Sequence, residues 1–391
     1  MSEDRTQPAP ASLLRPTWFE IDLDAIAHNL RQLRRMVGSG VAVYACLKRN
    51  AYGCGAVPVA RVMQREGADA IAVGNINDAL AIREAQVSLP ILLYPNCLAP
   101  EAGPAVMRHR LMPTISSLDD VAAWEQAANG ATLDAFAKID VGLFRGGVMP
   151  REALALLRRI ADSNVLGLAG AYAHLHGYDP ATDDDYAAWQ FRNFQTVMRE
   201  AASHRIDVPV RMVASTSVVL QHPEMDLNGV DPGRILYGLK PSPVPGRDLP
   251  LRPAVRAWKS RLILTKWIEP EDAGGFPGPF AVPGRRRIGV LPLGWGDGMP
   301  RRVPPQAAGL VGGRRVPVTG PVHLEHMRVD LTGVPDAKVG DEVVFLDTQG
   351  TNPITLDELT DCWGIDALDF LGGMRDHIAR VYVRDCAEIT S

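Results

Sequence analysis

A lysine ends an apolar run early in the chain, in the segment Ala45-Cys-Leu-Lys-Arg-Asn-Ala-Tyr-Gly-Cys-Gly55. An amine held among apolar groups loses hydration, which favours its neutral and nucleophilic form. Lys48 is therefore a candidate for covalent attachment to a carbonyl group. Taken alone, however, such a lysine is more often a surface residue that keeps its ammonium group in water.

Four further segments carry polar or ionisable residues beside apolar runs. They are Lys138-Ile-Asp-Val-Gly-Leu-Phe-Arg145, Tyr172-Ala-His174, Gly233-Arg-Ile-Leu-Tyr-Gly-Leu-Lys-Pro241 and Gly294-Trp-Gly-Asp-Gly298. Taken alone, His174 reads as a satisfied core histidine and Arg145 as a surface arginine. His174 and Arg145 each follow a segment that we predict below to be a strand of a parallel barrel. Enzymes with such barrels place the active site at the C-terminal ends of the strands, so we favour a functional role for both residues.

His323, Glu325 and His326 form a cluster that resembles a metal site at first sight. On a strand, His323 and Glu325 share a face and His326 points to the other. Two ligands on one face are too few for a structural zinc site. We therefore predict no bound metal, and interpret the cluster as acid/base groups of a pocket or as a solvated strand edge.

The segments that must position these residues repeat one sequence pattern, in which short apolar runs alternate with stretches of helical spacing. This pattern predicts a (β/α)8 barrel, whose parallel strands are buried on both faces. A strand over Trp18–Leu23 and a helix capped by Asp24 precede the barrel strands. The eight predicted barrel strands are Val41–Leu47, Ala70–Val73, Pro90–Tyr94, Leu111–Ile115, Ala135–Ile139, Leu166–Ala173, Val210–Ala214 and Ile235–Tyr237.

The character of the sequence changes after Lys240, where repeated prolines exclude a helix interior or a central strand. Beyond this point, alternating segments and Gly-Gly turns predict a β-rich domain. It contains one helix over Leu356–Trp363 with Thr355 as its cap. We therefore predict a disordered tail over 1–16, a barrel over 17–240 and a C-terminal β domain over 241–391.

Composition limits the function classes. The chain has 391 residues and a net charge of −4, which argues against nucleic acid or an anionic membrane as the main partner. It has no apolar run long enough for a transmembrane helix and no visible secretory leader. The five cysteines form no CxxC pair and are interpreted as free thiols in a reducing cytoplasm.

The five polar segments together resemble, in order and spacing, the motifs of the alanine racemase family of fold-type III pyridoxal-phosphate enzymes. The resemblance extends over roughly residues 17–384. It implies pyridoxal 5'-phosphate as the cofactor and a small amino acid as the substrate, bound as an external aldimine. It also implies a homodimer, in which the β domain of one subunit completes the active site of its partner.

The resemblance assigns roles to individual residues. Lys48 would hold the cofactor and act as one catalytic base, and His174 would stack against the pyridine ring or support its surroundings. Arg145 would bind the substrate carboxylate, and Lys138 corresponds to a position that can carry a carbamate. The residues implied around the cofactor phosphate are Tyr52, Thr216, Ser217, Gly233 and Tyr237.

Two departures from the family concern the reaction itself. The second base of the family is a tyrosine in a Gly-Tyr-Ala-Asp-Gly segment, and Trp295 stands in its place. An indole N–H only donates a hydrogen bond and cannot remove a proton from carbon. The family's arginine at the pyridine nitrogen is replaced by Asp231, which would pair with a protonated ring and make it a strong electron sink. If the register shifts, Arg234 takes that role or binds phosphate.

Two further departures concern the C-terminal domain. The family's phosphate-binding tyrosine aligns with Asp376, a carboxylate that phosphate would repel unless an arginine intervenes. The substrate-side segment contains His323 and Leu324. We predict that His323 is a replacement acid or base at the dimer interface and that Leu324 lies beside the substrate.

Three functions follow from these observations. Trp295 and Asp231 favour one-base chemistry at Cα, of a lyase, decarboxylase, aldolase or transamination type. Family membership favours an amino-acid racemase or epimerase with a substitute second base. A non-catalytic carrier of pyridoxal phosphate is the third, and the C-terminal β domain argues against it because single-barrel carriers lack such a domain.

Overall fold

The computed structural model describes residues 13–176, 185–240, 246–274, 276, 282 and 284–384. Contacts within the chain divide it into two units. Residues Leu23–Ala254 form one unit, and the segment that ends at Asp22 joins the segment that begins at Val255 to form the other.

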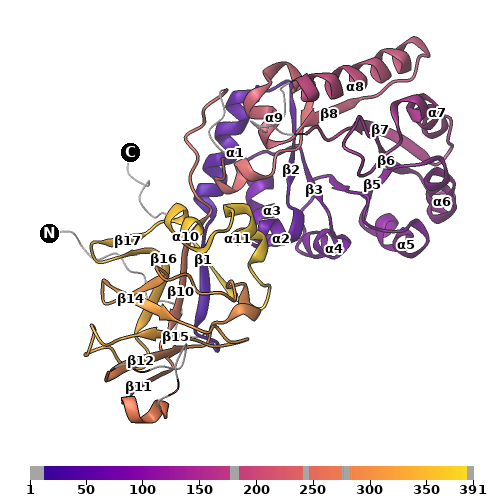
Figure 1. The fold of residues 1–391 in the computed structure, drawn as a ribbon. Helices are drawn as coiled ribbons and strands as arrows, with labels where there is room; N and C mark the ends of the chain where they lie inside the picture. The colour runs from indigo at the N-terminus through magenta and orange to yellow at the C-terminus, as the bar shows by residue number, and fades with distance from the viewer. Residues whose placement is uncertain are drawn as a thin grey trace, which may run out of the picture. The chain divides into compact units, whose positions relative to one another are not determined.

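The unit Leu23–Ala254 is a closed barrel of eight parallel strands with helices around it (Figure 1). The strands are β2 (Ala42–Cys46), β3 (Ala70–Val73), β4 (Ile91–Leu93), β5 (Leu111–Ile115), β6 (Leu133–Lys138), β7 (Leu166–Tyr172), β8 (Val210–Ala214) and β9 (Gly229–Val230). The helices are α1 (Leu23–Val37), α2 (Lys48–Tyr52), α3 (Ala56–Arg65), α4 (Ile76–Glu84), α5 (Ala99–His109), α6 (Leu118–Ala128), α7 (Pro150–Ala161), α8 (Asp185–Ser203) and α9 (Thr216–Gln221), with 3-10 turns η1 (Pro223–Met225) and η2 (Arg234–Tyr237).

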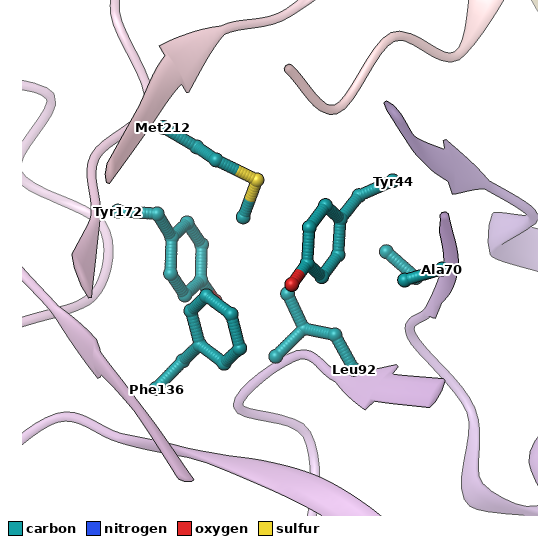
Figure 2. Close-up of a cluster of buried hydrophobic side chains, with 7 residues drawn as sticks. Tyr44, Ala70, Leu92, Phe136, Tyr172 and Met212 are labelled. Atoms are coloured by element: carbon teal, nitrogen blue, oxygen red, sulfur yellow. The ribbon is translucent and has the colours of Figure 1, made fainter. Parts of the chain in front are cut away.

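Large side chains from five strands, with two alanines from a sixth, fill the inside of the barrel (Figure 2). The buried cluster consists of Tyr44, Ala70, Ala72, Leu92, Phe136, Tyr172 and Met212. The Phe136 ring lies edge-on to Tyr44, with 5.5 Å between ring centroids, and edge-on to Tyr172 at 6.4 Å. The hydroxyl group of Tyr172 shares a 2.9 Å hydrogen bond with that of Thr114. The barrel interior is therefore a packed floor and not a pore.

Seven of the eight predicted barrel strands are confirmed, and the eighth is wrong. Ile235–Tyr237 lies within the 3-10 turn η2, and the barrel is closed by the two-residue strand β9 just before it. β9 pairs with β8 on one side and with β2 on the other. The three apolar residues of the predicted strand are buried side chains of a turn, and so short a run does not distinguish the two structures.

The segment that begins with Lys48 is a left-handed turn. The last four residues of α2 have φ between 53° and 55°, and each such residue costs roughly 1–2 kcal/mol relative to a right-handed turn. Two hydrogen bonds hold it: the backbone N–H of Asn50 donates to Asp78 (3.0 Å), and the N–H of Ala56 donates to the side chain of Asn50 (2.7 Å). Lys48 and Tyr52 stand at the two ends of this turn.

The other unit is built on a ten-stranded sheet in the order β11-β12-β15-β14-β13-β16-β10-β1-β18, with β17 beside β16. The strands are β1 (Thr17–Asp22), β10 (Val255–Arg261), β11 (Leu264–Ile268), β12 (Arg286–Leu291), β13 (Ala308–Val311), β14 (Arg314–Thr319), β15 (Met327–Asp330), β16 (Glu342–Gln349), β17 (Asn352–Ile354) and β18 (Ala379–Val383). The helices are α10 (Leu356–Trp363) and α11 (Ala367–Gly373), with 3-10 turns η3 (Pro270–Ala273) and η5 (Trp295–Asp297). As predicted, Thr355 caps α10 and accepts a 3.1 Å hydrogen bond from the N–H of Glu358.

The boundaries of the two units in the structure differ from the predicted domain boundaries. β1 pairs with β10 and β18, so residues 17–22 belong with the C-terminal sheet, and the barrel unit extends to Ala254 rather than to 240. The helix α1 begins at Leu23, which places Asp24 in its first turn instead of at its cap. Residues 1–12 of the predicted tail lie outside the described residues. Arg15 is ordered and donates a 2.7 Å hydrogen bond to Asp297.

Four of the five cysteines lie in the described segments, where Cys46, Cys54, Cys97 and Cys362 form no disulfide bond with one another; Cys386 lies outside them. Within the same segments, no group of three or more His, Cys, Asp or Glu side chains is arranged to hold a metal ion. Nor does any described helix combine the length and apolar character needed to cross a membrane.

Candidate active site

A cavity of about 570 Å³ lies at the C-terminal ends of the barrel strands. Residues that directly follow or end β2, β4, β5, β6, β7 and β9 contribute to its wall. Its ionisable residues are Lys48, Asp120, Lys138, Asp140, Arg145, His174 and Asp231, joined by Tyr94, Cys97 and Tyr172. The buried ring of Tyr172 also belongs to the core cluster, so the packed barrel interior forms the floor of the cavity.

Asp231 is a buried carboxyl group with one oxygen bonded and one free. Its Oδ2 accepts a 2.8 Å hydrogen bond from the hydroxyl group of Tyr94. Its Oδ1 is buried and has no hydrogen-bond partner. Burial raises the pKa of Asp231, while the Tyr94 hydrogen bond and the nearby ammonium groups of Lys138 and Lys48 oppose this shift. An unsatisfied buried oxygen is costly, so this atom suits a ligand that brings an N–H or O–H donor.

Lys48 and Lys138 both line the cavity, in different surroundings. Lys48 is half-buried, and its Nζ lies 5.7 Å from the ring centroid of Tyr94. Lys138 is buried, with its Nζ 3.9 Å from the ring centroid of Tyr172. Burial lowers the pKa of Lys138 to about 7, so a substantial share of this amine is neutral near neutral pH. A neutral amine is the form that reacts with a carbonyl compound or with carbon dioxide.

His174 follows β7 and is held in its uncharged form. Burial lowers the pKa of its imidazole to about 3, and the cations Lys138, Lys48 and Arg145 reinforce the shift. A neutral imidazole can pack against a flat ring without adding a further positive charge to the cavity.

The loop that carries Arg145 is shaped by Asp140. The carboxylate of Asp140 accepts backbone hydrogen bonds from Gly142, Leu143, Phe144 and Arg145, at 2.8–3.0 Å. Burial tends to raise the pKa of Asp140, but these four donors outweigh it and hold the pKa below its usual value. The guanidinium of Arg145 forms no ion pair with another described residue. Arg145 is thus an available cation for a carboxylate.

The predicted phosphate residues lie together on the β8 and β9 side of the barrel. The hydroxyl group of Thr216 accepts hydrogen bonds from the N–H groups of Gly233 (3.2 Å) and Ile235 (3.4 Å). The ring centroids of Tyr52 and Tyr237 are 4.7 Å apart, and the Tyr237 hydroxyl donates to the carbonyl of Cys46 at 3.1 Å. Ser217, next to Thr216 in α9, and Arg234, next to Gly233, are both half-buried.

Gly233 lies so close to Tyr52 that any other residue at this position would have to displace the tyrosine side chain. A Cβ atom at position 233 would stand 2.1 Å from the Tyr52 hydroxyl oxygen and 2.8 Å from the ring carbon that bears it. We expect Gly233→Ala to displace Tyr52 and to cost about 1–3 kcal/mol of stability, as overpacked sites do. Urea unfolding measures this cost, and titration with pyridoxal phosphate measures the loss of affinity. Gly40→Ala is the matched control, because a Cβ there meets nothing within 4 Å and Gly40 does not line the cavity. Equal effects of the two variants would contradict the prediction.

The predicted residues Trp295, His323 and Leu324 lie together in the β unit. The N–H of Trp295 donates to the carbonyl of His323 (3.0 Å), and the N–H of Gly296 to that of Leu324 (2.9 Å). The side chains of Trp295, His323 and Leu324 are all exposed. Buried Asp297 fixes the turn η5, because its Oδ2 accepts from the Gly294 N–H at 2.8 Å. Its Oδ1 lies 2.7 Å from Nε2 of His377.

Asp376 lies in the same unit, on the segment between α11 and β18. Its carboxylate is exposed and lies 3.9 Å from the guanidinium of Arg380. The arginine that its predicted place beside a phosphate would require is therefore present. The phosphate contact itself stays a prediction.

Sequence reasoning missed the role of Tyr94 and gave none to Asp140. Tyr94 stands directly after an apolar strand, β4, as Lys48 stands after β2. A polar group at the end of an apolar run was the signal used for Lys48, and it applies equally to Tyr94.

Two family models match the chain in succession. The model described as "Alanine racemase, N-terminal domain" matches residues 21–241, and that described as "Alanine racemase, C-terminal domain" matches residues 255–382. The gap between the two matches contains the proline-rich stretch and ends where β10 begins.

Individual relatives match over nearly their whole length. An alanine racemase of Desulforamulus reducens is 33% identical over 373 residues, which are 94% of this chain and 99% of that protein. One of Halothermothrix orenii is 30% identical over 376 residues, with 95% and 97% covered. The solved structure of alanine racemase from Streptomyces coelicolor superposes with a TM-score of 0.81 at 28% identity, covering 94% of this chain and 98% of that one.

Proposed function

Because the chain belongs to the alanine racemase family, we propose that it is a pyridoxal-phosphate-dependent racemase acting at Cα of a small amino acid. The observation that carries the proposal is that Lys48, Arg145, His174 and Asp231 line one and the same barrel cavity. Lys48 offers an amine for the cofactor's aldehyde, and Arg145 offers a cation for the substrate carboxylate. His174 offers a neutral imidazole to pack against the ring, and Asp231 offers a buried acid for the ring nitrogen.

The residues of the cavity suit the aldehyde and the ring of the cofactor, and the residues around Thr216, which do not line that cavity, suit its phosphate. Pyridoxal phosphate supplies an aldehyde, which reacts with amines, and a ring that stabilises negative charge developing at Cα. Lys48 would hold it covalently, and Tyr52, Thr216 and Gly233 would surround its phosphate. The Oδ1 of Asp231 would accept a hydrogen bond from the ring nitrogen, which would satisfy a buried carboxylate oxygen that has no hydrogen-bond partner among the described residues.

Arg145 would orient the substrate by binding its carboxylate group. Its backbone N–H is tied to Asp140, so the loop is held while the guanidinium stays available. Addition of carbon dioxide to the neutral Lys138 amine would form an N–C bond, release one proton to solvent and leave a negatively charged carbamate, which could pair with Arg145. The low pKa of Lys138, about 7, favours that reaction because the neutral amine is already populated.

Inversion at Cα requires a proton acceptor on one face and a donor on the other. Lys48 would serve as the acid/base group on one face of Cα. For the other face we propose His323, because Trp295 cannot accept a proton. Support comes from the 3.0 Å hydrogen bond between Trp295 and His323, which keeps His323 beside the position where the family has its tyrosine. We propose that these residues serve a partner subunit's cavity in a homodimer.

The test follows the Cα proton of single amino-acid enantiomers, beginning with L- and D-alanine, by NMR in D2O. We expect exchange with inversion in the unchanged protein. His323→Gln should slow inversion roughly 10²–10⁴-fold, the contribution of one acid/base group. Exchange with retention should persist for the enantiomer whose Cα proton faces Lys48. His326→Gln is the matched control, since His326 is also exposed and its carbonyl accepts from the His323 N–H at 2.9 Å. Loss of inversion in both variants alike would contradict the role of His323.

A second candidate function is one-base chemistry, and the observation that favours it is Asp231. A carboxylate at the ring nitrogen makes the ring a stronger electron sink than an arginine does, which suits lyase, decarboxylase, aldolase or transamination reactions. The same experiment separates the two: exchange with retention only, or formation of a keto acid, would favour this candidate. Absence of any exchange with cofactor bound would leave the carrier function.

A further inference from the structure

We propose that Tyr94 is a positioning residue, which holds the Asp231 carboxylate with Oδ1 turned to the cofactor's ring nitrogen and keeps the shared proton on that nitrogen. This inference rests on the proposed placement of Asp231 at the ring, and it adds a residue to which neither the sequence motifs nor the comparisons assign a function. It makes the pair Tyr94–Asp231 the unit that sets the electron demand of the cofactor.

The two carboxylate oxygens of Asp231 have different surroundings, so one is available to a ligand and the other is not. Oδ2 is occupied, because the Tyr94 hydroxyl donates to it at 2.8 Å. Oδ1 has no partner although it is buried. Both residues line the cavity that contains Lys48. A carboxylate fixed through one oxygen can rotate little, so its second oxygen faces a constant direction.

The orientation of Tyr94 is itself fixed by packing. Its ring centroid lies 5.8 Å from that of Tyr172, and the hydroxyl group of Tyr172 is already bonded to Thr114 at 2.9 Å. The backbone N–H of Tyr94 donates to the carbonyl of Val73 at 2.9 Å. The phenol therefore reaches Asp231 from a rigid strand end.

The charge balance around Asp231 explains why such a donor matters. Burial raises the pKa of the Asp231 carboxyl group, and the Tyr94 hydrogen bond, with Lys138 and Lys48, opposes this shift by favouring the anion. A carboxyl group and a pyridine nitrogen at hydrogen-bond distance share one proton. The group with the lower proton affinity releases it, so a hydrogen bond donated to the carboxylate moves the proton towards the nitrogen.

The experiment uses holoenzyme loaded with pyridoxal phosphate labelled with ¹⁵N in the ring, because the ¹⁵N chemical shift separates a protonated from an unprotonated ring nitrogen. We expect a pyridinium-type signal in the unchanged protein. Tyr94→Phe should move it towards the value of a hydrogen-bonded neutral pyridine, and Asp231→Asn should move it further. Site-specific 3-fluorotyrosine at position 94, a stronger donor, should move it in the opposite direction or leave it fully pyridinium.

Tyr44→Phe is the matched control, since Tyr44 is a buried barrel tyrosine of the core cluster and does not line the cavity; its signal should equal that of the unchanged protein. Circular dichroism checks that each variant is folded. If Asp231→Asn moves the signal and Tyr94→Phe does not, the role of Tyr94 is overturned while the proposed function stands. If Asp231→Asn also leaves the signal unchanged, the placement of Asp231 at the ring fails. Should Tyr94→Phe not fold, a 3-fluorotyrosine signal shifted towards neutral pyridine overturns the proposal.

Discussion

Lys48→Ala is expected to abolish covalent cofactor binding and to reduce turnover by more than about 10⁴-fold. One positioned acid/base group contributes roughly 10²–10⁴-fold, and Lys48 has in addition the role of covalent anchor in the proposed reaction. Lys48 is the cavity amine that begins the left-handed turn carrying Tyr52, so its loss leaves the phosphate-side residues in place. The variant should therefore bind pyridoxal phosphate weakly and without a bond.

Borohydride reduction followed by peptide mapping measures this effect. The unchanged protein should keep the cofactor on the peptide that contains Lys48, and Lys48→Ala should carry no label. Lys138→Met is the matched control, because Lys138 is the second lysine of the cavity wall and should be dispensable for attachment. A label on Lys138, or absorbance unchanged in Lys48→Ala, would refute the assignment of the anchor.

A Trp295→Tyr substitution in the His323→Gln background is expected to restore racemisation, by up to roughly 10²–10⁴-fold over the single His323→Gln variant. The reason is that a phenol can transfer a proton and an indole cannot. The backbone of η5 is suited to this exchange, because Asp297 and the carbonyl groups of His323 and Leu324 hold it without using the Trp295 side chain.

Polarimetry or coupled detection of the opposite enantiomer measures the rescue. Trp295→Phe in the same background is the control, since it changes the ring without supplying a hydroxyl group. A gain in the Phe variant equal to that in the Tyr variant would show that relief of bulk is responsible. No gain with Tyr would count against residue 295 as the position of the missing base.

The sequence predicted the barrel through its repeated apolar runs, and the places where it failed have local physical causes. β9 consists of Gly229 and Val230 alone, which is too short to show any period, whereas the adjacent Ile235–Tyr237 run resembles a strand more closely than the true one does. Closure of the barrel depends on pairing with β2 and β8, and local sequence does not encode pairing partners.

The strand at the beginning of the chain shows the same limit. The alternation after Thr17 correctly predicted a strand, but the partner of that strand, β10, lies more than two hundred residues further along. Strand order is set by packing of the whole sheet, and nothing in six residues indicates it.

The candidate site divides similarly into what was and was not visible. Lys48, Lys138, Arg145, His174 and Asp231 were named from motifs, and the structure brings all five to one cavity. Tyr94 was not named, because its partner Asp231 is 137 residues away in the chain and only barrel closure brings the two together. The sequence contains Asp140 within a motif, but its four backbone hydrogen bonds could not be predicted because they depend on the conformation of the loop.

The left-handed turn from Lys48 to Tyr52 has a consequence for how the protein loses its cofactor. A conformation held against its intrinsic preference relaxes first when surrounding contacts loosen. If these residues changed to right-handed backbone angles, the side chains of Lys48 and Tyr52 would move relative to each other while the barrel strands stay paired. Mild heating or denaturant should accordingly abolish the visible absorbance of the bound cofactor well before the circular-dichroism signal of the helices is lost. The protein would then lose its cofactor before it loses its fold.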